Sequence, residues 1–150
     1  MTNVEKSPNY WLVASMLGGR KEGDIFQDCI ERGYWYCWEP DAVFEESQKV
    51  EEMRNLLRSI NSGDRIAIKK QLGSGENAPF IEIRAIGIVK IVDTEEWRVY
   101  VDWLLPLKGD YTKEMSRRVP KKGPGGISSI SGPFKNNEIN HDWLPNIFCI

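Results

Sequence analysis

The sequence has few of the residues that crosslink a chain or bind metal ions. It contains three cysteines, Cys29, Cys37 and Cys149, which are widely spaced and include no C-x-x-C pair, and a single histidine, His141. Disulfide frameworks and structural zinc sites need paired cysteines, or cysteines and histidines at close spacing. We therefore expect neither a disulfide framework nor a structural zinc site, and the free cysteines fit a reducing, cytoplasmic location.

A strong charge of one sign and a long hydrophobic run are also missing. The formal net charge is -2, from 20 lysines and arginines against 22 aspartates and glutamates. A protein that holds nucleic acid by bulk electrostatics has a basic excess, so any such contact here must be local. No window approaches the roughly 20 apolar residues of a membrane span, and no basic segment followed by an apolar run begins the chain. We expect a soluble protein with no membrane partner.

Motifs of common enzymes do not occur. There is no G-x-S-x-G, no H-E-x-x-H and no G-x-x-x-x-G-K-[ST], and the stretch GPGGISS lacks the lysine that a phosphate-binding loop requires. His141 stands beside Asp142, and we interpret it as a loop histidine. The paired glutamates are interpreted as solubilising charges: Glu45/Glu46, Glu51/Glu52 and Glu95/Glu96. We therefore expect no enzymatic activity, no cofactor and no metal.

What is present is the composition of one globular domain. Hydrophobic residues make up 41% of the chain and charged residues 28%, and 150 residues suffice for a single core. We predict one domain over residues 1–150, with residues 1–8 as a loose N-terminal lead-in.

Two segments have the apolar spacing of amphipathic helices. In residues 44–61 apolar side chains recur at i, i+3, i+4 and i+7, which predicts a helix. A shorter helix is predicted over residues 24–33, with Asp24 as its N-cap and Gly33 as its end.

Strand patterns fill most of the remaining chain up to Pro106. The predicted strands cover residues 10–15, 65–70, 80–92 and 95–107. A glycine-containing loop joins the second of these strands to the third, and a short acidic turn at Asp93 and Thr94 joins the third to the fourth. We therefore expect the last three to be antiparallel neighbours, with a bulge at Gly87. Strands and helices in this order predict an α+β fold, a small barrel or curved sheet with helices packed on it.

The last third of the chain has a weaker pattern. Residues 108–126 combine basic side chains with a Pro/Gly run and are predicted to form a long exposed basic loop. ISSISGPF could add a short strand, and the apolar ending HDWLPNIFCI is expected to dock on the body of the domain.

Aromatic residues crowd the exit of the first predicted helix. The stretch IERGYWYCWEPD holds Tyr34, Trp35, Tyr36 and Trp38 within five residues. Side chains alternate along an extended segment, so Tyr34 and Tyr36 are predicted to share one face and Trp35 to lie on the other. Only one face can be buried, so core packing does not account for all four rings. Facing aromatic rings hold a planar base or a methylated cation well, because stacking contributes roughly 1–3 kcal/mol per base. Trp11 and Trp103, by contrast, are expected in the core.

These segments together resemble a known family. YWLVAS, DIFQDCIERGYWYC, SGDRIAIKK and the VDW strand are similar to the PUA-like superfamily, in its EVE and YTH branches. The similarity is greatest to the EVE-like N-terminal domains of McrB-type modification-dependent restriction proteins, and it covers roughly residues 10–107. It implies a curved, mostly antiparallel β-barrel with packed helices.

The resemblance also implies a base-binding pocket in which Trp35 forms one wall of an aromatic cage. Trp97 is the nearest candidate for the second wall, and Ser15 and Gln71 would read the base edge. The pocket residues implied are Ser15, Met16, Trp35, Tyr36, Trp38, Gln71, Leu72 and Trp97. Local positive charge would hold the nucleic-acid backbone, from Arg20, Lys21, Lys70, Arg117, Arg118, Lys121 and Lys122.

The function implied is a non-catalytic reader that captures a flipped modified base, most readily in methylated DNA. In the resembled family such domains give specificity to a GTP-driven translocase and a nuclease in restriction and anti-phage defence. No such motor occurs in this sequence, so we expect a GTPase or nuclease partner or a fused motor domain. Two alternatives remain open: a PUA-like module that binds modified RNA, and a structural or protein-interaction domain.

Overall fold

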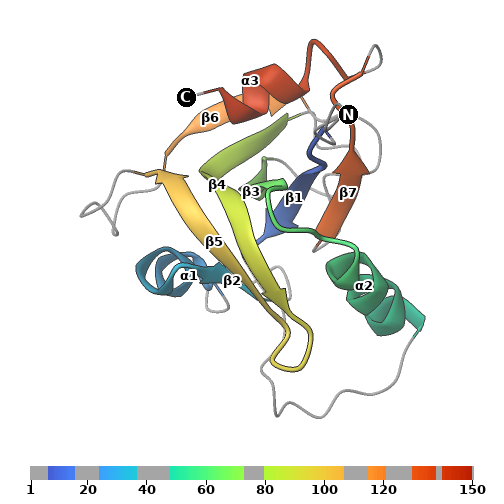
Figure 1. Cartoon of the computed structure of the whole chain (residues 1–150). Coiled ribbons are helices and arrows are strands. Elements are labelled where there is room, and N and C mark those ends of the chain that lie inside the picture. The colour runs from blue at the N-terminus through green and yellow to red at the C-terminus, as the bar shows by residue number, and fades with distance from the viewer. Residues whose placement is uncertain are drawn as a thin grey trace, which may run out of the picture.

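The computed structural model describes residues 7–15, 24–36, 48–72, 80–106, 115–120, 130–137 and 140–149 (Figure 1). In chain order its elements are β1 (Tyr10–Ala14), α1 (Phe26–Arg32), β2 (Tyr34–Trp35), α2 (Gln48–Arg58), β3 (Arg65–Leu72), β4 (Phe80–Asp93), β5 (Arg98–Leu105), β6 (Arg117–Pro120), β7 (Ile130–Phe134) and α3 (Leu144–Phe148). Helices and strands are mixed along the chain, so the predicted α+β class is confirmed.

One curved sheet holds all the strands of the described part of the chain. Its order is β2-β5-β4-β3-β1-β7, with β6 paired to β4. As predicted, β3, β4 and β5 are antiparallel neighbours, whereas β1 runs parallel to β3. The strands at the two ends of this order, β2 and β7, do not pair with each other among the described residues. The sheet is therefore open, whereas we predicted a closed barrel (Figure 1). With only two residues, β2 offers little backbone to close it.

The predicted helices α1 and α2 form, and α1 starts slightly later than predicted. The N-cap of α1 is Ile25 rather than Asp24, but the Asp24 carboxylate still accepts a hydrogen bond of 3.1 Å from the backbone N–H of Phe26. Gly33 ends α1 in the left-handed conformation, at φ 72°, which glycine adopts without a steric cost. The structure describes α2 from Gln48 onward, and residues 44–47 of that prediction lie outside the described residues.

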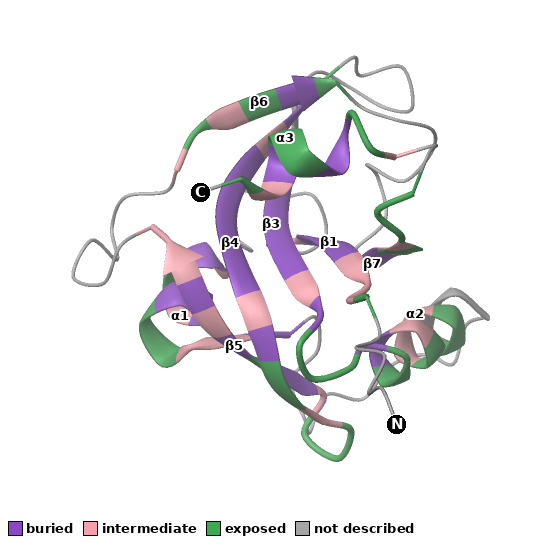
Figure 2. Cartoon of the chain, turned by 45° about the horizontal axis from the view of Figure 1, so that its top comes forward, coloured by how far each residue is buried: buried purple, intermediate pink, exposed green. Residues whose placement is uncertain are grey.

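Apolar side chains form two clusters, one on each face of the sheet. The central strands β3 and β4 are buried along most of their length (Figure 2). Alternation along β1 shows the division, because Trp11 and Val13 join the first cluster while Leu12 joins the second. Helices α1 and α2 cover the first face and α3 covers the second. Trp11 has no exposed surface and Trp103 is 8% exposed, so both are core residues as predicted.

A close approach between β4 and β5 depends on Gly87. The pairing of these strands is irregular at the predicted place, between Ile86 and Gly87, but the extra residue lies on β5, because Ile86 pairs with Leu105 and Gly87 with Trp103. A Cβ atom at Gly87 would lie 2.4 Å from Cγ1 of Val101 and 2.8 Å from the carbonyl oxygen of Asp102. Only glycine fits this position without a shift of its neighbours.

The C-terminal segment docks on the sheet, as predicted. Trp143 donates its indole N–H to the carbonyl of Pro120 at 2.8 Å, and Arg117 donates to the carbonyl of Ile147 at 2.9 Å. The segment ISSISGPF does contribute a strand, β7. The predicted basic loop over residues 108–126 is wrong in part, because β6 pairs with β4 inside that range. No helix in the described part of the chain is long and apolar enough to cross a membrane.

Candidate functional site

Two of the residues predicted to line a pocket, Ser15 and Trp35, meet at the carboxyl end of β1. Trp35 lies in β2, paired with Val99 of β5, and its indole N–H donates to the carbonyl of Ala14 at 2.9 Å. Ser15 follows Ala14 directly. Both Ser15 and Trp35 have no exposed surface. The structure therefore places the two residues as neighbours, and it encloses both of them.

A buried arginine organises the same region. Arg84 of β4 is 5% exposed and donates to Oγ of Ser15 at 2.6 Å. It also forms a bidentate ion pair with Asp24, at 2.9 Å from Nη1 to Oδ1 and 2.8 Å from Nη2 to Oδ2. Its guanidinium carbon lies 4.4 Å from the centre of the Phe26 ring. Burial of the charge is tolerated because the guanidinium is paired, hydrogen-bonded and stacked.

This ion pair fixes how the chain leaves β1 and enters α1. The backbone N–H of Ile25 donates to the carbonyl of Ser15 at 2.8 Å, next to the Arg84–Asp24 pair. Burial alone would raise the pKa of the Asp24 carboxyl, but the hydrogen bonds from Arg84 and from the N–H of Phe26 outweigh it, and this pKa lies below its usual value. Asp24 is therefore ionised at neutral pH.

The Ser15 hydroxyl is already used within the fold, because its oxygen accepts the hydrogen bond from Arg84. We predicted that this side chain reads a base edge, and that role stays a prediction beside the contact with Arg84. The prediction from sequence missed Arg84. One signal was available: Arg84 is the single cation in FIEIRAIGIV, a central-strand run that is apolar apart from Arg84, Glu82 and Gly87, and buried charges need partners.

The tyrosines on either side of Trp35 share one carboxylate. The hydroxyls of Tyr34 and Tyr36 donate to Oδ2 of Asp28 at 2.9 and 3.3 Å, and Arg98 lies 4.0 Å from the centre of the Tyr36 ring. Burial, followed by the hydrogen bond to Asp28, raises the pKa of Tyr34. Alternation predicted that these two tyrosines share a face, and this is confirmed. Tyr36, predicted to line the pocket, is 6% exposed.

Trp97, the predicted second wall, lies in the turn between β4 and β5. Its backbone has φ 55°, a conformation that side-chain-bearing residues rarely adopt. The guanidinium carbons of Arg54 and Arg58 on α2 lie 5.2 and 5.0 Å from the centre of its ring. The half-buried indole therefore connects the hairpin to α2 through cation–π contacts.

The other residues predicted to line the pocket or to contact the nucleic-acid backbone lie in several parts of the chain. Met16, Arg20, Lys21, Trp38, Lys121 and Lys122 lie outside the described residues. Gln71 and Leu72 end β3, and their side chains are also outside the description. Lys70 is half-buried, with Nζ 3.9 Å from the carboxylate of Glu82.

On β6, Arg118 is exposed and its guanidinium carbon lies 5.7 Å from the centre of the Phe80 ring. Arg117, by contrast, is half-buried and donates to the carbonyls of Ile147 and Cys149. We predicted Arg117 as part of an exposed loop, and it instead holds the C-terminal segment, because β6 brings it alongside α3.

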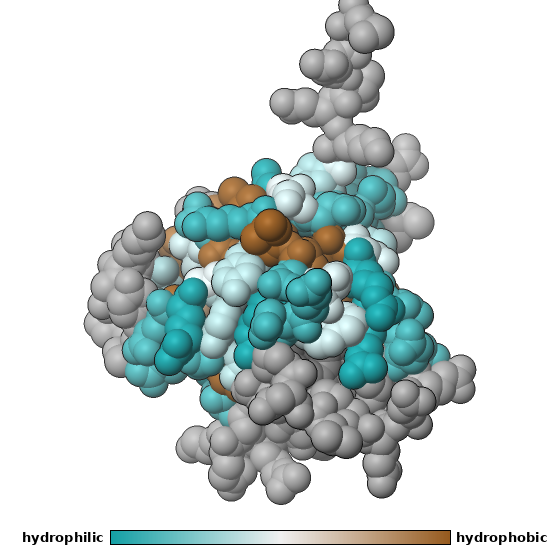
Figure 3. All heavy atoms as spheres, turned by 60° about the horizontal axis from the view of Figure 1, so that its bottom comes forward, coloured by the Kyte–Doolittle hydropathy of each residue, from teal (hydrophilic) through white to brown (hydrophobic). Residues whose placement is uncertain are grey.

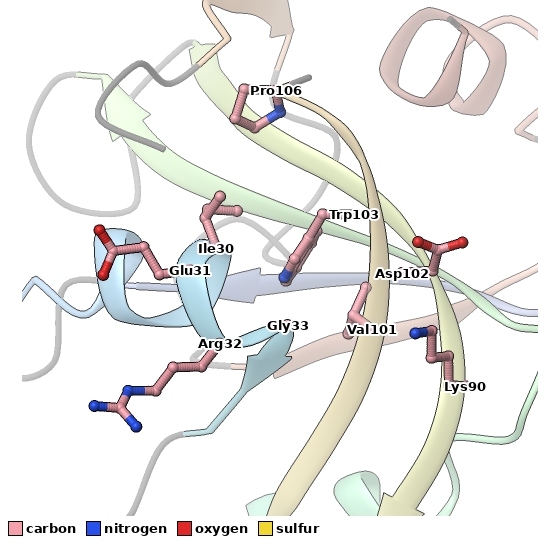
Figure 4. Close-up of a pocket in the computed structure, with 9 residues that line it drawn as sticks. All are labelled: Ile30, Glu31, Arg32, Gly33, Lys90, Val101, Asp102, Trp103 and Pro106. Atoms are coloured by element: carbon pink, nitrogen blue, oxygen red, sulfur yellow. The ribbon is translucent and has the colours of Figure 1, made fainter. Parts of the chain in front are cut away.

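A small cavity lies beside α1, between its C-terminal end and β5 (Figure 4). Trp103 and Val101 form one wall and Ile30 faces them, while the side chains of Glu31 and Arg32 point away (Figure 4). Its volume is about 170 Å³, below the roughly 300 Å³ at which small-molecule pockets begin. Trp35 does not line it. This cavity is therefore a poor candidate for the predicted base pocket.

Exposed apolar side chains gather on the outer surface of the β4–β5 hairpin. Ile91 is 59% exposed and its cross-strand partner Tyr100 is 36% exposed. The ring of Tyr100 lies 6.2 Å from that of Tyr34. The lower face of the molecule shows hydrophobic residues within a mostly hydrophilic surround (Figure 3). Exposed patches of this kind are a feature of interaction surfaces.

Chemically reactive groups are scarce where the structure can be described. Among those residues, no group of three or more histidine, cysteine, aspartate and glutamate side chains is placed to hold a metal ion. Burial raises the pKa of the Cys29 thiol to about 12, so Cys29 is not a thiolate at neutral pH. The groups that are organised here are aromatic rings and hydrogen-bonded ion pairs.

No model of a known protein family matches the chain, and no curated protein matches it.

Proposed function

We propose that the protein is a non-catalytic reader of a modified base in nucleic acid, with a PUA-like fold of the EVE and YTH type. The observation that carries the proposal is the anchoring of the Trp35 indole at the carboxyl end of β1, beside Ser15. The resemblance in sequence implies this same pairing of a strand end with a tryptophan from the segment after the first helix.

The surroundings of Trp35 suit a pocket wall that is fixed before the base arrives. The bond to Ala14 sets the plane of the indole, and the Arg84–Asp24 pair holds the strand end that carries Ala14 and Ser15. A ring held in this way loses little side-chain freedom on binding, which favours affinity. Because Trp35 has no exposed surface, capture of a base requires neighbouring groups to move away from the ring.

DNA is the nucleic acid we propose, as the McrB-type resemblance implies, with a GTPase or nuclease as the partner that acts on the recognised site. Modified RNA is the alternative substrate. Parallel binding measurements with methylated DNA and methylated RNA oligonucleotides of one sequence separate the two.

A second candidate function is favoured by two specific observations. Trp35 is completely buried, and the apolar residues Ile91 and Tyr100 are exposed together on the hairpin. In this alternative Trp35 only fills the core, and the domain binds another protein through the hairpin surface.

The test compares two substitutions at Trp35. Trp35→Phe keeps an aromatic face, whereas Trp35→Leu keeps an apolar side chain but removes the face on which a base can stack. Each variant is titrated, at one fixed low salt concentration, with fluorescent duplexes and single strands that carry unmodified or methylated bases. Melting temperatures are measured in parallel, because core substitutions of this size destabilise by roughly 1–3 kcal/mol or more.

We expect the wild type and Trp35→Phe to prefer one modified oligonucleotide, and folded Trp35→Leu to lose that preference. The proposal fails if the wild type binds no modified oligonucleotide better than its unmodified control. It also fails if Trp35→Leu, still folded, keeps the full preference.

A further inference from the structure

A large groove lies at the opposite end of β1 from Ser15 and Trp35. It has a volume of about 810 Å³ and is formed by residues 7–9, by the turn and strand start at residues 61–65, and by Lys135. Six of its lining residues have a polar uncharged or cationic side chain: Ser7, Asn9, Asn61, Ser62, Arg65 and Lys135. The groove is large enough for a ligand of nucleotide size.

The single carboxylate among the described lining residues is turned inward. Asp64 is 4% exposed. Its Oδ1 accepts from the backbone N–H of Asn9 at 3.1 Å, and its Oδ2 accepts from the indole of Trp11 at 2.9 Å and from the N–H of Asn61 at 3.0 Å. Three donors therefore stabilise this negative charge inside the fold, and it does not face the open side of the groove.

Cations remain at the mouth of the groove. The guanidinium of Arg65 is held in place by a hydrogen bond from Nη1 to the carbonyl of Gly63, which leaves its other nitrogens without a partner among the described residues. Lys135 is exposed, and no described residue pairs with its ammonium group. In a chain whose net charge is -2, this is a local excess of positive charge.

The half-buried amide of Asn9 adds hydrogen-bonding capacity to the same groove. Oδ1 of Asn9 is buried without a hydrogen-bond partner among the described residues. The two ends of an amide are interchangeable by rotation, so Asn9 can present either an acceptor or an NH₂ donor there. An unsatisfied buried polar atom costs free energy, which a bound ligand recovers.

We infer that this groove binds a phosphodiester group of the nucleic-acid strand whose modified base is captured near Trp35. Arg65 and Lys135 supply the positive charge, since arginine and lysine are the main phosphate ligands of DNA-binding proteins. The five residues of β1 span about 17 Å, which corresponds to about five base pairs of DNA. One strand can therefore reach both ends of β1. The inference rests on the proposed function, because it uses the same strand.

The experiment measures the salt dependence of binding for Arg65→Gln, Lys135→Gln and the double variant. Each protein is titrated with a modified and an unmodified fluorescent oligonucleotide of at least ten nucleotides, at several salt concentrations. Loss of one phosphate contact lowers the slope of log affinity against log salt by about 1. We expect that decrease for each single variant and about twice that decrease for the double variant, with the preference for the modified base unchanged.

Arg32→Gln is the matched control, because Arg32 is an exposed cation on α1, outside the groove, and is paired with Asp28. It is expected to leave the slope unchanged. If the groove variants keep the slope and affinity of the wild type, the inference is overturned.

A second measurement separates a strand phosphate from a free one. Melting temperatures of the wild type and the double variant are recorded with inorganic phosphate and with a nucleoside monophosphate, against chloride at equal ionic strength. One outcome is that the phosphate compounds raise the melting temperature of the wild type but not of the double variant, while the double variant binds oligonucleotides as the wild type does. The groove is then a site for small phosphates, and its role in strand binding is overturned. If no oligonucleotide binds at all, the proposed function fails, and these melting temperatures decide whether the groove binds phosphate.

Discussion

Arg84 and Asp24 lie 60 positions apart in the chain and form a bidentate ion pair, with N–O distances of 2.8 and 2.9 Å. The pair joins β4, in the middle of the sheet, to the residue two positions before the start of α1. Through Ser15 it also fixes the end of β1. The geometry of the candidate site therefore depends on a contact that does not touch the Trp35 ring.

Asp24→Asn is the first substitution that tests this pair. The variant keeps the shape of the side chain but leaves the buried guanidinium without a counter-charge, so we expect a loss of about 2–3 kcal/mol in the free energy of unfolding. Denaturation in urea measures it. Glu31→Gln, at an exposed carboxylate on α1, is the control and should change stability by less than about 0.5 kcal/mol. An equal, small effect of both variants would contradict a structural role for the pair.

The same pair makes stability depend on acidity. The pKa of Asp24 is lower in the folded chain than its ordinary value of 3.8, so between these two pKa values the unfolded chain binds more protons than the folded one. The stabilisation is fully present above the unfolded pKa and is lost as the pH falls through the folded pKa. We expect the free energy of unfolding to fall below about pH 4, and to fall less steeply in Asp24→Asn. Unfolding curves between pH 2 and pH 6 give the comparison, and parallel curves would rule out this contribution.

Much of the fold follows from local patterns, and these patterns predicted it. Apolar spacing predicted α1 and α2, and alternation with short connections predicted the antiparallel order of β3, β4 and β5. Gly87 stands alone in a strand pattern, which predicted the place at which the pairing of β4 and β5 becomes irregular. Pairing between distant segments was harder. The parallel contact of β1 with β3 and the pairing of β6 with β4 depend on the path of the whole chain, and the composition around Arg117 and Arg118 is equally typical of a loop.

The candidate site, like the fold, could be predicted from the sequence only in part. The sequence predicted Ser15 at the end of a strand, and it predicted Trp35 on the other face of its segment from Tyr34 and Tyr36. The structure brings Ser15 and Trp35 together. Alternation sorts side chains into two faces but does not say which face is enclosed, so the burial of Trp35 was not predictable. The partner of a buried charge is a property of the folded chain, and for that reason Arg84 and Asp24 were not recognised as a pair.

Gly87→Ala tests the close approach of β4 and β5. The added Cβ would lie 2.4 Å from Cγ1 of Val101 and 2.8 Å from the carbonyl oxygen of Asp102, so the strands must shift and we expect a loss of about 1–3 kcal/mol. Combining it with Val101→Ala removes the nearest contact but not the second one. Urea unfolding of the two single variants and the double variant should therefore show that the double variant is more stable than the sum of the single effects predicts. Simple additivity would mean that the clash with Val101 does not cause the loss.

Two substitutions at Trp97 separate the effect of its backbone strain on stability from the effect of its ring contacts. Trp97→Ala and Trp97→Gly both remove the stacking with Arg54 and Arg58, but only glycine accepts φ 55° without a steric cost. We expect both variants to be less stable than the wild type, and the glycine variant to be more stable than the alanine variant by about 1 kcal/mol. Unfolding midpoints in urea with equal m-values make the comparison. If alanine is as stable as glycine, the turn relaxes once the ring is removed, and the two arginines rather than the chain around the turn hold Trp97 in its left-handed conformation.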